Sequence, residues 1–74
     1  MNVIQARLVL QALKIEISTW DNNHRMQLTA EPAMKIFGRL LKVDAYALFG
    51  KGLKGRINAH NWLSLQVAQA DQED

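Results

Sequence analysis

The sequence predicts an all-α fold, a small bundle of three to four helices. Apolar residues recur every three or four positions over the first twenty residues, and capping residues stand before later apolar segments. Both patterns are typical of helices. The absence of cysteine excludes disulfides and thiolate zinc sites as supports, so the fold must rest on packing or on a partner chain. A chain of 74 residues has material for one domain, which we place at residues 1–70.

The first twenty residues are expected to form the longest helix. Its opposite face is polar, with Arg7, Gln11, Lys14 and Ser18. The apolar face is a heptad seam, which suits a two-helix interface within a symmetric dimer unless other helices of the same chain cover it. The seam residues are Val3, Ala6, Leu10, Leu13, Ile17 and Trp20.

Further apolar residues lie beside this seam, namely Ile4, Leu8, Val9 and Ile15. They make the apolar stripe wider than one small neighbour covers. The helix is therefore expected either to be central to the fold or to be shared with a second copy.

A short β-hairpin over residues 14–29 is the alternative for this region. Residues 14–19 alternate with period two and are rich in β-branched side chains, residues 21–24 suit a turn, and residues 25–29 would return as the partner strand. Such a hairpin is stable only when it packs on something else. We favour the helix because the seam runs unbroken to Trp20.

A second helix is expected to begin after Thr29 as its N-cap, with Glu31 and Pro32 in its first turn. One side is apolar, and the other side carries cations. The apolar residues are Ala33, Ile36, Phe37 and Leu40, and the cations are Lys35, Arg39 and Lys42.

Asp44 is expected to cap a short third helix over residues 45–49, which Gly50 ends. Residues 51–56 suit a glycine-rich basic loop, and Asn58 suits the N-cap of the last helix. The apolar face of that helix comprises Ala59, Trp62, Leu63, Val67 and Ala70. Residues 71–74 are expected to form an acidic, frayed tail.

The charge distribution makes nucleic acid the best-supported partner from sequence. The formal net charge is +2, yet residues 35–56 hold six cations against the single acid Asp44. The second and third helices resemble a helix-turn-helix in outline, and the last helix offers polar side chains to base edges. The predicted contacts are Lys35, Arg39, Lys42, Lys51, Lys54, Arg56, Asn58, His60 and Asn61. The alternative is a helical protein-interaction or dimerisation module without a nucleic-acid role.

Enzymatic and metal-dependent functions are not expected. The two histidines, His24 and His60, have no catalytic or zinc-binding motif around them, and a fold of this size leaves little room for a closed pocket. We therefore expect no cofactor, metal or small-molecule substrate. No apolar run reaches the length of a membrane helix and the N-terminus lacks a signal-peptide pattern, so we expect a cytoplasmic protein without membrane contact.

One set of residues resembles a known group of proteins. Arg7, the segment 13–19, Leu28-Thr29, Phe49-Gly50 and Lys54-Gly55 occur in an order that resembles short uncharacterised proteins of phages and prophages. This chain carries residues 20–25 where that pattern has a single glycine, and an insertion separates its last two motifs. The resemblance implies a bacterial or phage setting in the cytoplasm and no particular activity.

Overall fold

The computed structural model describes residues 1–20 and 31–72. These residues form four helices, α1 (Val3–Thr19), α2 (Ala33–Leu41), α3 (Ala45–Phe49) and α4 (Gly52–Gln72), and the described part contains no strand. The predicted all-α class is confirmed. The hairpin alternative is wrong in its first strand, because residues 14–19 belong to α1. Its turn and second strand, residues 21–29, lie outside the described residues.

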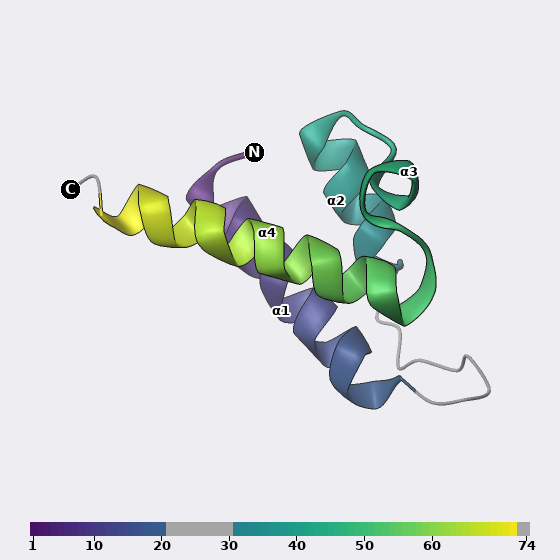
Figure 1. Cartoon of the computed structure of the whole chain (residues 1–74). Helices are drawn as coiled ribbons and strands as arrows, with labels where there is room; N and C mark the ends of the chain where they lie inside the picture. Colours follow the sequence, from purple (N-terminus) through teal and green to yellow (C-terminus); the bar gives the residue numbers. More distant parts are fainter. Residues whose placement is uncertain (21–30, 73–74) are drawn as a thin grey trace.

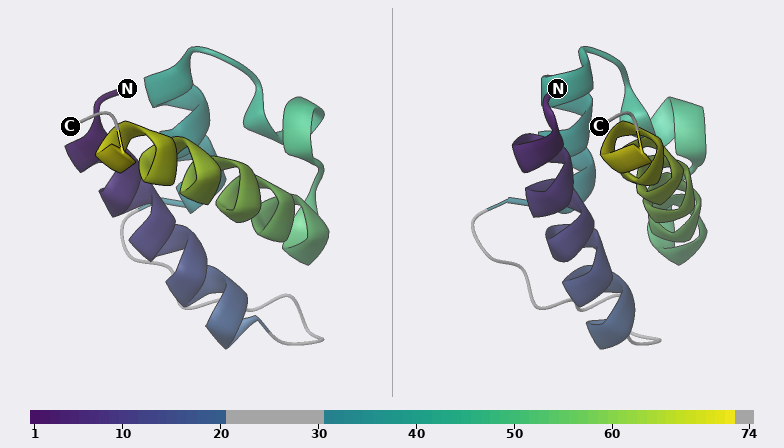
Figure 2. Two further views of the ribbon diagram at one scale, coloured as in Figure 1. Left: turned by 60° about the vertical axis from the view of Figure 1, so that its left-hand side comes forward. Right: turned by 90° about the vertical axis from the view of Figure 1, so that its left-hand side faces the viewer.

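The helices form two layers. Helices α1 and α2 lie together on one side, and α3 and α4 lie on the other, as Figures 1 and 2 show. Contacts between α1 and α4 are the most extensive, followed by those between α1 and α2. The interior between the layers is therefore covered on one side by α1 and α2 and on the other by α3 and α4.

The core lies between these layers. Its largest fully buried side chains are Phe37, Leu13, Met34 and Leu63. The ring of Phe37 stacks on Phe49, with centroids 5.4 Å apart, and lies 6.1 Å from the ring of Trp62. The predicted apolar faces of α2 and α4 are confirmed, since all their members are buried, half-buried or, for Trp62, packed in this aromatic cluster.

Two of the helix starts follow local capping rules. Asn2 and Gln5 form a capping box at the start of α1, each side chain accepting a hydrogen bond from the other's backbone N–H. The Asp44 carboxylate accepts the N–H of Ala47 at the start of α3, and Gly50 follows the helix at a φ of 111°. The predicted third helix is thus confirmed at both ends.

The predicted start of α2 is wrong. This helix begins at Ala33, with Pro32 as a cap residue that provides no side-chain hydrogen bond. Glu31 and Pro32 therefore precede the helix, and Thr29 lies outside the described residues.

The predicted loop over residues 51–56 is also wrong, because α4 begins at Gly52. A Cβ on Gly55 would collide with the carbonyl group of Gly50. Glycine at position 55 of α4 therefore allows the backbone of Gly50 to approach the helix closely. Asn58 lies inside α4 and donates a side-chain hydrogen bond to the Phe49 carbonyl, 3.0 Å away. The helix also continues through Gln72 into the predicted tail, whose residues 73–74 lie outside the described part.

Candidate functional site

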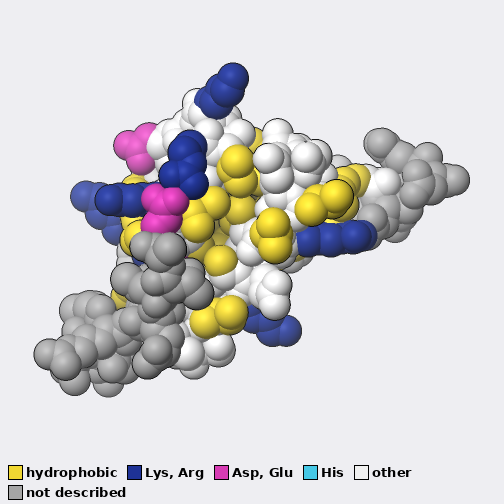
Figure 3. Space-filling model, turned by 180° about the vertical axis from the view of Figure 1, so that it is seen from behind, with side chains coloured by type: hydrophobic (Ala, Val, Ile, Leu, Met, Phe, Trp, Pro, Cys, Tyr) yellow, Lys and Arg dark blue, Asp and Glu magenta, His cyan; other side chains and the backbone are white. Residues whose placement is uncertain are grey.

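An apolar groove lies on the outer surface of α1 and α2. Its volume is about 210 Å³, and it is lined by Gln5, Leu8, Val9, Ala12, Ile36 and Leu40. Figure 3, seen from the side of these two helices, shows hydrophobic side chains over the middle of the face with Lys and Arg side chains around them. A groove of this kind accepts apolar side chains rather than charged ones.

Exposed side chains of α1 extend the groove. Leu8 is 62% exposed and Ile4 is 72% exposed, and Ile15 has 40% of its surface exposed. Since an α-helix has 3.6 residues per turn, these three positions fall on one narrow sector of α1. That sector borders Ala12 on the groove side. Contiguous exposed apolar surface is typical of interaction sites.

Three exposed cations and two acids surround this face. Lys35 and Arg39 of α2 line one pocket with Glu31 and Asp44. The third cation, Lys14, projects from α1 about 160° around the helix from Ala12. Arg39 forms an exposed ion pair with Glu31 at 2.8 Å. Within α1 and α2 themselves the only acid is Glu16, which is 3% exposed and faces the interior.

The fold separates the cations that the sequence placed on one nucleic-acid surface. Lys35 and Arg39 are on α2, and the exposed Lys42 follows that helix at a φ of 61°. Lys51 and Lys54 are exposed at the start of α4. The end of α2, which Lys42 follows, is apart from the start of α4 in every view of Figures 1 and 2. Lys35 lies in the first turn of α2, at the end where Ala33 and Arg56 share the carboxylate of Glu16. Two basic groups result, one on each layer.

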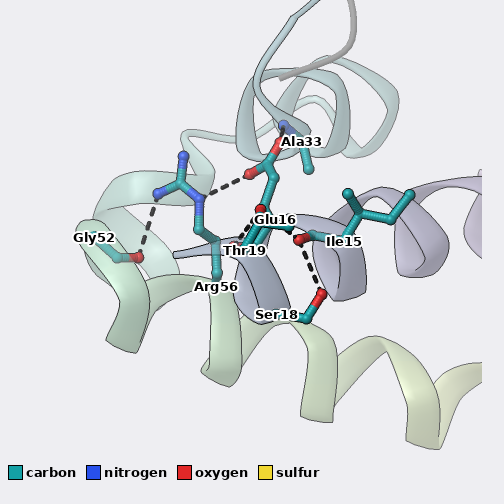
Figure 4. Close-up of polar contacts among 7 residues, drawn as sticks. All are labelled: Ile15, Glu16, Ser18, Thr19, Ala33, Gly52 and Arg56. Carbon is teal, nitrogen blue, oxygen red and sulfur yellow. Dashed lines mark hydrogen bonds and ion pairs between the residues drawn. The ribbon is translucent and has the colours of Figure 1, made fainter. Parts of the chain in front are cut away.

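Arg56 is not part of either group, which corrects its predicted place on the surface. It is 4% exposed, and its Nε–H donates to Glu16 Oε1 at 2.8 Å (Figure 4). Its Nη1 donates to the Gly52 carbonyl at 3.2 Å, and its Cζ lies 5.1 Å from the Trp20 ring centroid and 5.9 Å from that of Tyr46. The guanidinium is held inside the fold because its charge is matched there.

Glu16 connects three helices in the same network. Its Oε2 accepts the backbone N–H of Ala33 at 2.7 Å while Oε1 accepts from Arg56 (Figure 4). Both carboxylate oxygens are therefore satisfied away from water, as a buried charge requires. Sequence reasoning missed this residue. The available signal was its spacing, since Ala6, Val9, Leu13 and Glu16 follow each other at helical intervals.

The remaining predicted nucleic-acid contacts are all on α4. Asn58 and Asn61 are exposed, and His60 is half-buried. Helix α3, which would be the recognition helix of a helix-turn-helix, has five residues and Tyr46 as its only polar side chain. Base edges in the major groove require several side-chain donors and acceptors, and α3 supplies one hydroxyl.

The predicted interface seam of α1 is used inside the chain. Ala6 and Leu13 are buried, and the other four members (Val3, Leu10, Ile17 and Trp20) are half-buried. The partners that cover α1 are α2 and α4. The buried line of α1 runs through Ala6, Val9, Leu13 and Glu16 and is therefore rotated from the predicted seam, which stays a prediction as an interface between copies.

A second apolar cavity, of about 190 Å³, lies where the start of α1 meets α4, lined in part by Met1, Trp62 and Val67. Within residues 1–20 and 31–72 there is no cluster of three or more residues of the types His, Cys, Asp and Glu placed to hold a metal ion. Among the described helices, none combines the length and apolar character needed to cross a bilayer. Comparison of the chain with protein-family models, curated proteins and solved structures finds no match.

Proposed function

We propose that this chain is a non-catalytic protein-interaction module that binds a partner helix in the groove between α1 and α2. The observation that carries the proposal is the exposed apolar sector of α1 beside this groove. Helix-in-groove binding uses such a surface, in which apolar side chains of an amphipathic helix enter a hydrophobic groove at helical spacing.

The size of the surface is consistent with this function. A standard interface buries about 800 Å² on each partner, which is about 15% of the 5197 Å² surface of the chain. One face of two helices provides an area of that order. Burying the exposed part of Leu8 alone is worth about 1–2 kcal/mol, so a few such side chains suffice for a specific complex.

The cations support this function better than they support nucleic-acid binding. Counterion release requires several cations on one surface, whereas Arg56 is buried and Lys42 follows the end of α2 that lies apart from the start of α4 (Figures 1 and 2). The short α3 also lacks the side chains of a recognition helix. We therefore propose that the chain is a helical protein-interaction module, which the sequence offers as the alternative to nucleic-acid binding.

A peptide-display selection tests the proposal. The library consists of amphipathic peptides about as long as α1, with a fixed leucine ridge and with Glu, Lys, Gln and Ser randomised at the other positions. Selection is performed on the wild-type chain and on Leu8→Asp, which alters a side chain that is 62% exposed and leaves the core intact. We expect selected peptides to bind the wild type at least tenfold more tightly than Leu8→Asp, about 1.4 kcal/mol.

The matched control is Leu65→Asp, since Leu65 on α4 is also 62% exposed. It should retain the affinity of the wild type. Peptides that bind the wild type, Leu8→Asp and Leu65→Asp with equal affinity would refute the proposal that the groove is the binding site. Amide shifts over both Lys35 and Lys54 on addition of a mixed-sequence DNA duplex at physiological salt would replace the proposal with nucleic-acid binding.

A further inference from the structure

We infer that the partner helix carries acidic residues along the edge of its apolar ridge that faces α2. This inference rests on the proposed function and adds the chemistry of the partner. It follows from the charges around the groove, which have one sign on the exposed surfaces of α1 and α2.

The charge imbalance has a structural origin. Glu16 is the only acid within α1 and α2, and it is buried against Arg56 at 2.8 Å, so it contributes nothing to the outer face. The cations of the two helices point outward, and Lys35 and Arg39 are both exposed. Glu31 and Asp44, which flank α2, line one pocket with Lys35 and Arg39 and offset part of this charge, Glu31 through its pair with Arg39. The balance of the face remains positive.

The cations nearest the groove stand on its α2 side. On α2, Arg39 lies next to Ile36 on the side away from the core, because three residues separate them along the helix. On α1, Lys14 is two positions from Ala12 and therefore projects about 160° around the helix from the groove lining. A helix lying in the groove therefore has cations along its α2 edge, where long Lys and Arg side chains reach its flank.

The same charges oppose a second copy of this chain as the occupant. Two copies that met through this face would bring two surfaces of the same net sign together. Like charges in close contact disfavour association. An acidic helix instead gains attraction at the α2 edge, which selects the partner and raises the rate of encounter.

The peptide selection provides the test. Sequences enriched on the wild type should carry Glu rather than Lys beside the leucine ridge. A selected acidic peptide is then titrated against two double variants, Lys35→Glu with Arg39→Glu and Lys51→Glu with Lys54→Glu. Each changes the net charge equally, but only the first pair borders the groove. We expect the first to weaken binding about tenfold and the second to weaken it less than threefold.

Each outcome separates the inference from the proposed function. Enrichment of neutral or basic peptides that still depend on Leu8 refutes the acidic partner and keeps the groove. Equal weakening by the two double variants refutes the local role of the rim cations. A wild-type chain that sediments as a dimer, and that Leu8→Asp converts to a monomer, makes a second copy the occupant and overturns the inference.

Discussion

Replacing Glu16 by glutamine is expected to remove a large part of the stability of this fold. The substitution retains the shape of the side chain but removes its charge. In the wild type, each carboxylate oxygen accepts one hydrogen bond, from Arg56 at 2.8 Å and from the Ala33 N–H at 2.7 Å. Glutamine has one oxygen, so one of these donors faces an amide NH₂ group, which is itself a donor.

The magnitude follows from burial. The side chains of Arg56 and Glu16 are 5% and 4% exposed, and removing one partner of a buried ion pair costs about 3–5 kcal/mol because the other charge stays buried. A domain of 74 residues has a free energy of unfolding of about 4–11 kcal/mol. The loss is therefore a large part of the total.

Urea denaturation followed by far-UV circular dichroism measures this loss. The matched control is Glu31→Gln, which breaks the ion pair with Arg39. That pair has the same 2.8 Å distance, but its side chains are 62% and 34% exposed. We expect the control to cost less than about 1 kcal/mol.

The reasoning would be refuted if Glu16→Gln and Glu31→Gln had equal effects. The double variant Glu16→Leu with Arg56→Met adds a second check. Replacing both charges by apolar side chains should recover part of the loss. The recovery should be incomplete, by about 1–3 kcal/mol, since the Ala33 N–H then lacks its acceptor.

Two further predictions concern the backbone. Gly55→Ala is expected to lower the thermal midpoint strongly, because its Cβ would collide with the Gly50 carbonyl; a midpoint within a degree or two of the wild type would contradict the close approach of these two glycines. Asn2→Ala should cost about 1 kcal/mol in urea denaturation, since it removes the side-chain acceptor of the Gln5 N–H at 2.8 Å. No loss in Asn2→Ala would mean that the capping box adds nothing to α1.

The sequence predicts those structural features, such as helix ends, that depend on residues close together along the chain. Asp44 and Gly50 bound α3 as expected, because capping acts within one turn. The start of α4 could not be predicted, since Gly55 suits a loop by local preference and its real role is contact with Gly50. Arg56 has the sequence context of a surface cation, and the partner that buries it is 40 positions away.

For the same reason, the candidate site could be predicted from the sequence only in part. The sequence shows that the apolar face of α1 is broad, because Leu8 and Ile15 lie beside the heptad seam. Which of these apolar residues remain exposed to solvent depends on where α2 and α4 pack against α1, and no local sequence pattern contains that information. The separation of the end of α2, which Lys42 follows, from the start of α4 likewise arises from the packing of the helices (Figures 1 and 2).

The bond from Ala33 to Glu16 has a consequence for the order of folding. Helix α2 has nine residues and no side-chain cap from its own N-cap residue, whereas isolated helices below about 12–15 residues are marginal in water. Its first N–H is accepted by a carboxylate 17 positions earlier, on α1. Helix α2 thus gains its initiation signal only once α1 has docked against it. The two helices form one cooperative unit, and a fragment that contains α2 without α1 would lack the group that starts the helix.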